Sequence, residues 1–259
     1  MSTALIGYTG FVGGNLARQA RFDDLYRSTD IDTIAGKHYE LVVSAGAPSL
    51  KWKANMEPDG DRAAIDRLIA ALDALGHVHT FVLISTVDVY PHPVGVDEET
   101  PIAPADLMPY GRHRWTLERF VQERFNSTLV RLPNLFGDGL KKNPLYDLMH
   151  GHRIDQIHQD GVLQWYSLSD LWADLSLVLQ HNLKVVNFAT EPLPTRDVAR
   201  DVFGLDLRNQ LPAPAPNYDF RTRHAAVWGQ HGGYLRSRDE IRLRIERFVR
   251  ENRAGAAPV

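Results

Sequence analysis

The stretch GYTGFVG, residues 7–13, joins an apolar segment typical of a buried strand to a segment with helical periodicity. Glycine suits such a junction because the turn is tight, the backbone can approach a pyrophosphate, and the helix packs closely on the strand with its N-terminus facing the anion. A simple tight turn is the alternative, since the bare GxxGxxG pattern is weak. Its place at the first strand-to-helix junction favours a dinucleotide-binding turn made of Gly7, Thr9, Gly10, Phe11, Val12 and Gly13.

Strand-like and helix-like segments alternate along the rest of the chain. Apolar runs rich in β-branched residues predict strands at 3–7, 40–46, 80–86, 127–133 and 184–189, and amphipathic patterns predict helices at 11–20, 61–75, 115–125 and 169–180. Near-continuous apolar strands indicate a parallel sheet that is covered on both faces. The order therefore predicts an α/β fold with a Rossmann-like, doubly wound parallel sheet. Residues 253–259 are expected to form a loose tail.

The composition is that of an ordinary globular protein, and it narrows the class of partner. Of 259 residues, 44% are hydrophobic and 24% charged, and the formal net charge of -3 gives no basic excess for nucleic acid or an anionic membrane. The absence of cysteine excludes a disulfide framework and a cysteine nucleophile. The histidines lack the neighbours of a metal centre, and neither a leader nor a membrane span is indicated. We expect a cytoplasmic protein with a small-molecule substrate and no metal.

The second strand, expected at 24–27, bears on the choice of cofactor. In dinucleotide-binding folds an acidic residue at the end of this strand binds the ribose 2′-hydroxyl, and a basic one accommodates a 2′-phosphate. Arg27 and Ser28 suit the phosphate of NADP. The alternative is that Arg27 is solvated and Asp30 takes the ribose, in which case the cofactor is NAD.

Three segments further along the chain carry a resemblance. The strand end ISTVDVY, residues 84–90, places Thr86, Asp88 and Tyr90 on one face at the edge of the sheet where ligands bind. Tyr110 and Arg114 are spaced to share one face of a helix, and VRLPNLFG follows at 130–137. With the glycine turn, these motifs resemble the extended short-chain dehydrogenase/reductase family, the group of NAD-dependent epimerases and dehydratases. The resemblance extends over nearly the whole chain.

The resemblance implies a role for each matching residue. It makes Thr86 the hydroxyl that hydrogen-bonds the reacting oxygen and Tyr110 the general acid/base, with Arg114 where the family has a catalytic lysine. It implies further cofactor contacts from Ala45, Gly46, Ala47, Tyr110, Arg114 and Pro133, and substrate contacts from Asp88, Asn134, Lys142 and Arg221. It also implies a dinucleotide-binding domain over 1–190, with a substrate-lobe insertion at about 138–162, and a small C-terminal substrate lobe over 191–259.

The arginine at the lysine position leaves two functions open. One is an NAD(P)-dependent oxidoreductase or epimerase that acts on a carbonyl or hydroxyl of a sugar-like substrate, either free or nucleotide-linked. The other is a catalytically retired NAD(P)-binding sensor or scaffold. Dehydration is less favoured, because Val87 and Asp88 stand where dehydratases carry an acid pair. Asp88 itself either acts on substrate or binds nearby backbone amides, and Lys51, Trp52 and Lys53 lie either near the nicotinamide or in solvent. A homodimer paired through the helix that begins near residue 108 is also implied.

Overall fold

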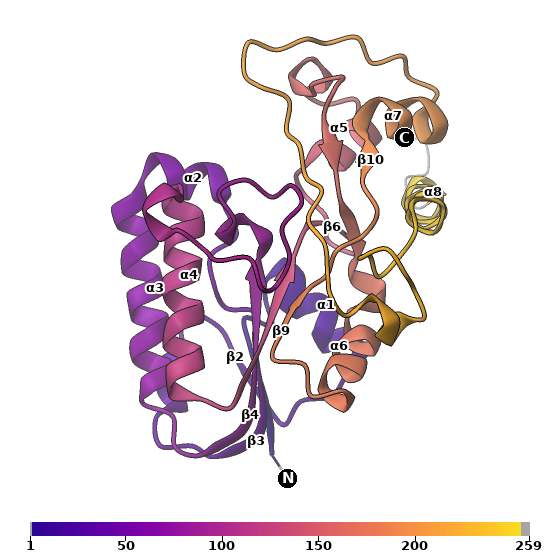
Figure 1. The fold of residues 1–259 in the computed structure, drawn as a ribbon. Helices are drawn as coiled ribbons and strands as arrows, with labels where there is room; N and C mark the ends of the chain where they lie inside the picture. The colour runs from indigo at the N-terminus through magenta and orange to yellow at the C-terminus, as the bar shows by residue number, and fades with distance from the viewer. Residues whose placement is uncertain (1, 255–259) are drawn as a thin grey trace. The chain divides into compact units, whose positions relative to one another are not determined.

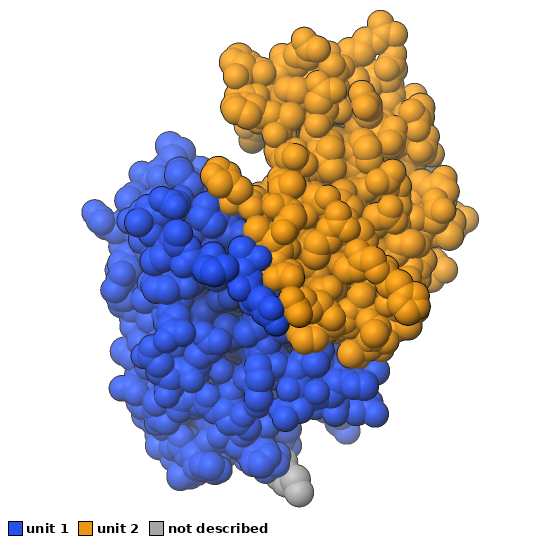
Figure 2. Space-filling view, in the orientation of Figure 1, with its two compact units in different colours: residues 1–91, 98–132, 169–187 blue, residues 92–97, 133–168, 188–259 orange. Residues whose placement is uncertain are grey.

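A computed structural model describes residues 2–254 of the chain. They divide into two compact units that alternate along the sequence, coloured blue and orange in Figure 2. Unit 1 comprises residues 1–91, 98–132 and 169–187, and unit 2 comprises residues 92–97, 133–168 and 188–259. Each unit therefore contains segments from both halves of the chain.

Unit 1 is built on one parallel sheet. Its strands, in the spatial order β2-β1-β3-β4-β5-β9, are β2 (Asp24–Tyr26), β1 (Thr3–Ile6), β3 (Tyr39–Ser44), β4 (Val78–Thr86), β5 (Ser127–Leu132) and β9 (Val185–Asn187). All five neighbouring pairs are parallel. This confirms the predicted α/β fold with a parallel, Rossmann-like sheet.

Helices cover both faces of this sheet (Figure 1). On one face lie α2 (Lys51–Met56), α3 (Pro58–Asp73) and α4 (Pro109–Arg124), and on the other lie α1 (Phe11–Gln19) and α6 (Leu171–Gln180). Alternate strand residues serve the two faces, as the two-residue period requires: Val42, Phe81 and Leu83 belong to the core cluster with Ile65 and Leu68 of α3. Both faces of the sheet are therefore covered by helices and shielded from solvent, which explains why the strand sequences are continuous apolar runs.

Unit 2 has its own core, of which Phe136, Trp165 and Ile241 are members. Its strands are β6 (Asn134–Phe136), β7 (Val162–Leu163), β8 (Trp165–Ser167) and β10 (Leu193–Pro194), and its α-helices are α5 (Pro144–His150), α7 (Thr195–Phe203) and α8 (Arg238–Ala254). The parallel pair β6–β8 and the antiparallel pair β7–β10 form two small sheets. No helix among the described residues is long and apolar enough to cross a membrane.

Several boundaries differ from the sequence-based expectations. The helix expected at 61–75 begins three residues earlier, with Pro58 in its first turn, a position that suits proline because the first N–H groups of a helix have no helical partner. Residues 51–56, for which the sequence analysis predicted no helix, form the short helix α2. Of the expected tail, residues 253 and 254 belong to α8, and 255–259 lie outside the described residues.

The glycine turn gives a test of the packing between β1 and α1. A Cβ atom at Gly13 would lie 2.1 Å from the carbonyl oxygen of Gly7, whereas one at Gly14 would meet its nearest neighbour, Tyr8 O, at 3.4 Å. Gly13→Ala should therefore lower the free energy of unfolding by roughly 1–3 kcal/mol, because the helix must move off the strand. Gly14→Ala is the matched control, and it should be neutral or stabilising, by at most about 1 kcal/mol. Urea unfolding followed by circular dichroism compares them; equal loss in both variants would contradict the packing argument.

Candidate active site

The candidate site lies at the carboxyl edge of the sheet in unit 1. The strand order reverses here: β2 lies on one side of β1, and the next strand in the sequence, β3, lies on the other. In open α/β sheets ligands bind in the crevice that forms at such a reversal. The glycine turn leaves the end of β1, residues 45–50 leave the end of β3, and Thr86 ends β4.

Two of the three motif glycines are explained by the packing of the chain on itself. Gly7 has a φ angle of +85°, and a Cβ there would lie 2.4 Å from the carbonyl oxygen of Ala45. Gly13 approaches Gly7 as described above. Gly10 differs, because its added Cβ would meet only Gly7 O, at 3.2 Å. The packing of the fold therefore leaves the space beside Gly10 open to a ligand.

The start of α1 fits the pyrophosphate of a dinucleotide. Gly10 is its N-cap, and among the described residues no side chain caps the helix and no acidic residue lies in its first turn. The first N–H groups of a helix lack helical partners and favour negative charge. The end of this nine-residue helix can therefore bind a phosphate through backbone donors alone.

Arg27, the residue expected to bind a 2′-phosphate, is paired within its own loop. Its Nε lies 3.2 Å from Asp30 Oδ2, and its backbone N–H donates to Asp30 Oδ1 at 2.7 Å. The two side chains are 54% and 39% exposed, so this pair is weak and open to exchange with another anion. The loop just beyond β2 thus holds Arg27, Ser28 and Asp30 together. Either the basic or the acidic side chain could bind the ribose of a cofactor there.

Thr86, Asp88 and Tyr110 come together at the end of β4. The Thr86 hydroxyl is hydrogen-bonded to the Tyr110 side chain, accepts from the Asp88 N–H at 3.2 Å, and donates to Asp88 Oδ2 at 3.4 Å. Lys51 of α2 donates from Nζ to Asp88 Oδ1 at 2.6 Å. The tertiary structure therefore joins four polar side chains from β4, the loop after it, α4 and α2.

Arg114 is held by a set of partners that the sequence alone did not indicate. Its Nη2 donates to Asp61 Oδ1 at 2.8 Å and to the carbonyl oxygen of Pro48, and its Nη1 donates to Asp61 Oδ2. The guanidinium also lies over the ring of Tyr110, 4.0 Å from its centroid. Asp61 accepts in addition from His113 Nδ1, 2.7 Å away. Arg114 therefore joins α3, α4 and the loop after β3.

One N–H donor of the Arg114 guanidinium is not accounted for by these contacts. Arg114 Nε is buried and has no hydrogen-bond partner within the described part of the chain. A buried N–H without a partner costs free energy, so its presence points to a ligand that completes it. A ribose hydroxyl of the cofactor is chemically suited to this role.

Burial and charge act against each other on the two ionisable groups at this site. Burial raises the pKa of Tyr110, as does Asp88, whereas Arg114, Lys51 and the Thr86 hydrogen bond lower it; the net pKa lies above the ordinary value. Burial also raises the pKa of Asp61, but hydrogen bonds from Arg114 and His113 outweigh it, and the net pKa lies below the ordinary value. Asp61 is thus a carboxylate that neutralises the charge of Arg114. Arg114 therefore lowers the pKa of Tyr110 but does not bring it below its ordinary value.

Asp61 and Asn55 are the residues that sequence reasoning missed. Asn55 Oδ1 accepts the backbone N–H of Tyr110 at 3.0 Å and so fixes the start of α4. A signal for Asp61 was present, because it lies on the apolar stripe of α3 with Ile65, Leu68 and Leu72. Arg114 occupies the corresponding place on α4, with Leu117 and Val121. A charged residue on the buried stripe of each of two helices suggests a buried ion pair.

The expected substrate residues Asn134, Lys142 and Arg221 belong to unit 2. Asn134 donates from its side chain to the Gln164 carbonyl at 3.3 Å, and Lys142 is exposed in the loop before α5. Arg221 pairs with Asp219 at 2.9 Å and lies over the ring of Tyr234, 4.3 Å from its centroid. It lines a hollow of about 490 Å³ to which Arg238 also contributes. Unit 2 therefore offers two guanidinium groups in one concave surface.

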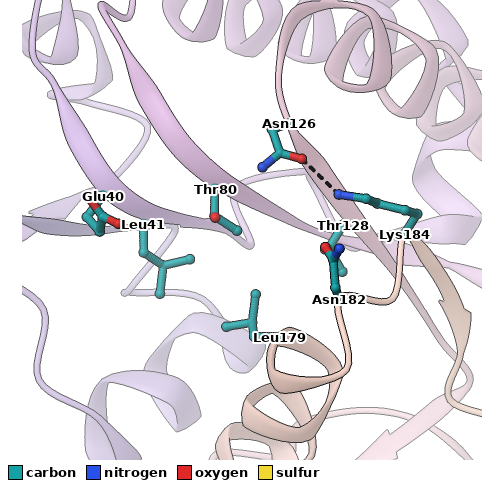
Figure 3. Close-up of a pocket in the computed structure, with 8 residues that line it drawn as sticks. All are labelled: Glu40, Leu41, Thr80, Asn126, Thr128, Leu179, Asn182 and Lys184. Carbon is teal, nitrogen blue, oxygen red and sulfur yellow. Dashed lines mark hydrogen bonds between the residues drawn. The ribbon is translucent and has the colours of Figure 1, made fainter.

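A second hollow, of about 210 Å³, lies at the opposite edge of the sheet (Figure 3). Thr80 and Thr128, near the starts of β4 and β5, line it, and Lys184 donates to Asn126 at 2.8 Å beside them. The amino ends of parallel strands are not where ligands of such sheets bind. Over residues 2–254, no group of three or more histidine or acidic side chains is placed to hold a metal.

Comparison with known proteins bears on the same site. Residues 21–175, more than half of the chain, match the model of the NAD dependent epimerase/dehydratase family, a range that excludes the glycine turn. The search of curated proteins found no match.

Solved structures share the fold. The chain is similar to UDP-glucose 4-epimerase of Thermotoga maritima with UDP-glucose, at 14% identity and a TM-score of 0.72, covering 99% of this chain and 100% of that one. It is similar to dTDP-4-dehydrorhamnose reductase of Bacillus anthracis in complex with NADP, at 17% identity and a TM-score of 0.71, covering 97% and 99%. It is also similar to MoeE5 in complex with UDP-glucose and NAD, at 17% identity and a TM-score of 0.73, covering 99% and 100%.

The buried ion pair predicts a large effect on stability. Asp61→Asn should lower the free energy of unfolding at pH 7 by roughly 3–5 kcal/mol, because Arg114 is left buried without its counter-charge. Asp66→Asn is the matched control, since Asp66 pairs with Arg62 on the same helix at about half exposure. It should cost no more than about 1 kcal/mol. Urea unfolding measures both.

The pH dependence follows from the lowered pKa of Asp61. Its stabilisation is complete above the unfolded-state pKa and is lost as the pH falls through the lower folded-state pKa. Asp61→Asn should therefore flatten the acid side of the stability profile, and the added change Arg114→Met should restore part of the loss. Equal unfolding free energies for Asp61→Asn and Asp66→Asn would contradict the pair's importance.

Proposed function

Because the chain belongs to the NAD-dependent epimerase/dehydratase family, we propose that it acts on a carbonyl or hydroxyl group of a nucleotide-linked sugar, as an NAD(P)-dependent oxidoreductase or epimerase. The observation that carries this proposal is the hydrogen-bonded pair of Thr86 and Tyr110 at the carboxyl edge of the sheet. A hydroxyl donor next to a phenol is the arrangement needed to bind and protonate one oxygen atom. The uncapped end of α1 in the same unit supplies a place for the cofactor's phosphates.

The side chains divide the chemistry between them. When bound, the nicotinamide supplies or accepts a hydride. Thr86 hydrogen-bonds the reacting oxygen, and Tyr110 gives a proton to that oxygen in reduction or removes one in oxidation. Arg114 Nε binds the cofactor's ribose, and the further cofactor contacts come from Gly7, Thr9, Gly10, Phe11, Val12, Gly13, Ala45, Gly46, Ala47 and Pro133.

We assign further substrate contacts to residues of unit 2. Arg221 binds the diphosphate, because a guanidinium matches phosphate oxygens with two parallel donors. Asn134 and Lys142 bind other polar groups of the substrate, and Asp88 of unit 1 contacts the sugar. Support for a nucleotide-linked sugar comes from similar structures that contain UDP-glucose.

A second function is favoured by one observation. Asp61 neutralises Arg114, and burial holds the pKa of Tyr110 above its ordinary value, so the proton transfer is harder than in a site with an unpaired lysine. An NAD(P)-binding sensor or scaffold that has lost catalytic activity would combine an intact cofactor-binding turn with poor proton transfer in this way. Cofactor binding without turnover of any candidate substrate would support it.

NADP is the cofactor that we assign within this proposal. Arg27 and Ser28 suit the 2′-phosphate, which would replace Asp30 as the partner of the guanidinium. Similar structures contain NADP in one case and NAD in another. We propose in addition that the protein is cytoplasmic, and that it forms the homodimer paired through α4 that the sequence resemblance implies.

The role of Tyr110 is tested by removing one oxygen atom. Tyr110→Phe should lose nearly all turnover, at least a hundredfold in kcat, while the dissociation constant for NADPH stays within about twofold, because the ring under Arg114 remains. The assay follows NADPH oxidation with a panel of nucleotide-sugar ketones. Tyr146→Phe, in unit 2, is the control and should retain activity. Wild-type rates in Tyr110→Phe would show that Tyr110 is only a helix residue.

The choice of cofactor is tested at Arg27. Arg27→Ala should weaken NADPH binding by about tenfold and leave NADH binding nearly unchanged, since only NADPH carries the 2′-phosphate. Fluorescence titration with both reduced cofactors measures this. Gly10→Val is the second variant, and it should lose both, because a branched side chain would occupy the space beside the pyrophosphate. Tighter binding of NADH than NADPH by the wild type would assign the ribose to Asp30 and the cofactor to NAD.

A further inference from the structure

The buried arginine cannot move protons. A guanidinium stays protonated at any working pH. Two of its nitrogens are engaged by Asp61 and the Pro48 carbonyl, and the side chain is 3% exposed. Arg114 can therefore hold charge and position Tyr110, but it cannot return a proton to Tyr110 between turnovers. An acid/base residue that works repeatedly needs a route to water.

A different cation reaches Tyr110 through a continuous set of polar contacts. The Tyr110 side chain is hydrogen-bonded to the Thr86 hydroxyl, which donates to Asp88 Oδ2 at 3.4 Å. The other oxygen of Asp88 accepts from Lys51 Nζ at 2.6 Å. Tyr110 is half-buried, the Asp88 side chain is 20% exposed, and the Lys51 side chain at the end of the route is 47% exposed. The route therefore begins at the acid/base phenol and ends at solvent.

We propose that Lys51 supplies the protons that Tyr110 exchanges with substrate, through Asp88 and Thr86, while Arg114 only positions Tyr110. This inference rests on the proposed function of the same site. It assigns separate residues to two roles, those of a fixed positive charge beside the phenol and a group that can release a proton. Lysine suits the second role, because its ammonium group can lose a proton when a partner accepts it.

The proton balance in the direction of reduction is as follows. Tyr110 gives its hydroxyl proton to the oxygen that the hydride transfer has made negative, and becomes a phenolate. Lys51 gives a proton from Nζ to the Asp88 carboxylate, and the carboxyl group turns to give that proton to the Thr86 oxygen as Thr86 gives its own hydroxyl proton to the phenolate. Water then reprotonates Lys51, so the net consumption is one proton from solvent. In oxidation each transfer runs in reverse.

Other charged groups around Tyr110 are fixed by their own partners. Arg114 on α4 is paired with Asp61 of α3, which also binds His113. Asp88 raises the pKa of Tyr110, and Lys51 lowers it. Loss of the Lys51 charge therefore removes a cation that lowers the pKa of Tyr110 and removes the salt bridge to Asp88.

The experiment compares Lys51→Met, Lys51→Arg and a control, Lys184→Met, at the opposite edge of the sheet. Phenolate absorbance is titrated with Tyr110→Phe as the reference, which isolates Tyr110 and needs no substrate. Lys51→Met should raise the pKa of Tyr110 by about one unit, whereas Lys51→Arg and Lys184→Met should leave it unchanged. With NADPH and a nucleotide-sugar ketone that the wild type reduces, both Lys51 variants should lower kcat at least tenfold across the pH profile, with NADPH affinity unchanged.

The outcomes separate this inference from the proposed function. An unshifted Tyr110 pKa in Lys51→Met overturns the inference whether or not a substrate is known. Wild-type kcat in Lys51→Arg also overturns it, because only the charge would then matter. A shifted pKa together with no turnover by the wild type on the whole panel overturns the proposed enzyme function, and leaves the electrostatic effect of Lys51 on Tyr110 established.

Discussion

The buried ion pair between Asp61 and Arg114 is the interaction on which the site depends. It joins α3, α4 and the loop after β3, and it places a guanidinium against the ring of Tyr110. Two buried charges are stable only when they are paired and hydrogen-bonded, and here nearly every donor and acceptor has a partner. The exception is Arg114 Nε, which has no hydrogen-bond partner among the described residues and which we assign to a ligand. The position of Tyr110 is thus determined by the same contacts that make the arginine tolerable inside the protein.

A second buried pair secures the other side of α4. Glu118 accepts from Arg131 of β5 at 2.6 Å and from the Ser85 hydroxyl at 2.5 Å, and Arg131 donates to the Tyr90 hydroxyl at 2.7 Å. This network connects α4 to the ends of β4 and β5, next to Thr86. Helix α4 is therefore anchored to α3 by one charge pair and to the sheet by the other. Such anchoring on both sides restricts Tyr110 to one position relative to Thr86, which proton transfer over hydrogen-bond distances requires.

The charged groups near Tyr110 differ in their access to solvent: Arg114 is buried, and Lys51 lies at the surface. Burial raises the pKa of Tyr110, Arg114 is the charge that lowers it most, and Asp88 and Lys51 act on it in opposite directions with smaller effects. A cation that is neutralised and buried positions its neighbour, whereas a cation at the surface can exchange protons with water. In the proposed relay, Arg114 accordingly positions Tyr110 and the proton enters through Lys51.

Local patterns in the sequence determined the fold class and much of the candidate site. Apolar runs and the glycine turn predicted the parallel sheet, because a strand buried on both faces is a continuous apolar run that can be recognised without knowing its neighbours. The spacing of Tyr110 and Arg114 placed them on one helix face. Only the tertiary structure decided the partners of these residues. Asp61 and Asn55 contact Arg114 and Tyr110 from more than fifty residues away, and Lys51 contacts Asp88 from 37 residues away, so no local period relates these partners. Their pKa directions likewise depend on burial and on charges from several elements, which exist only once the chain has folded.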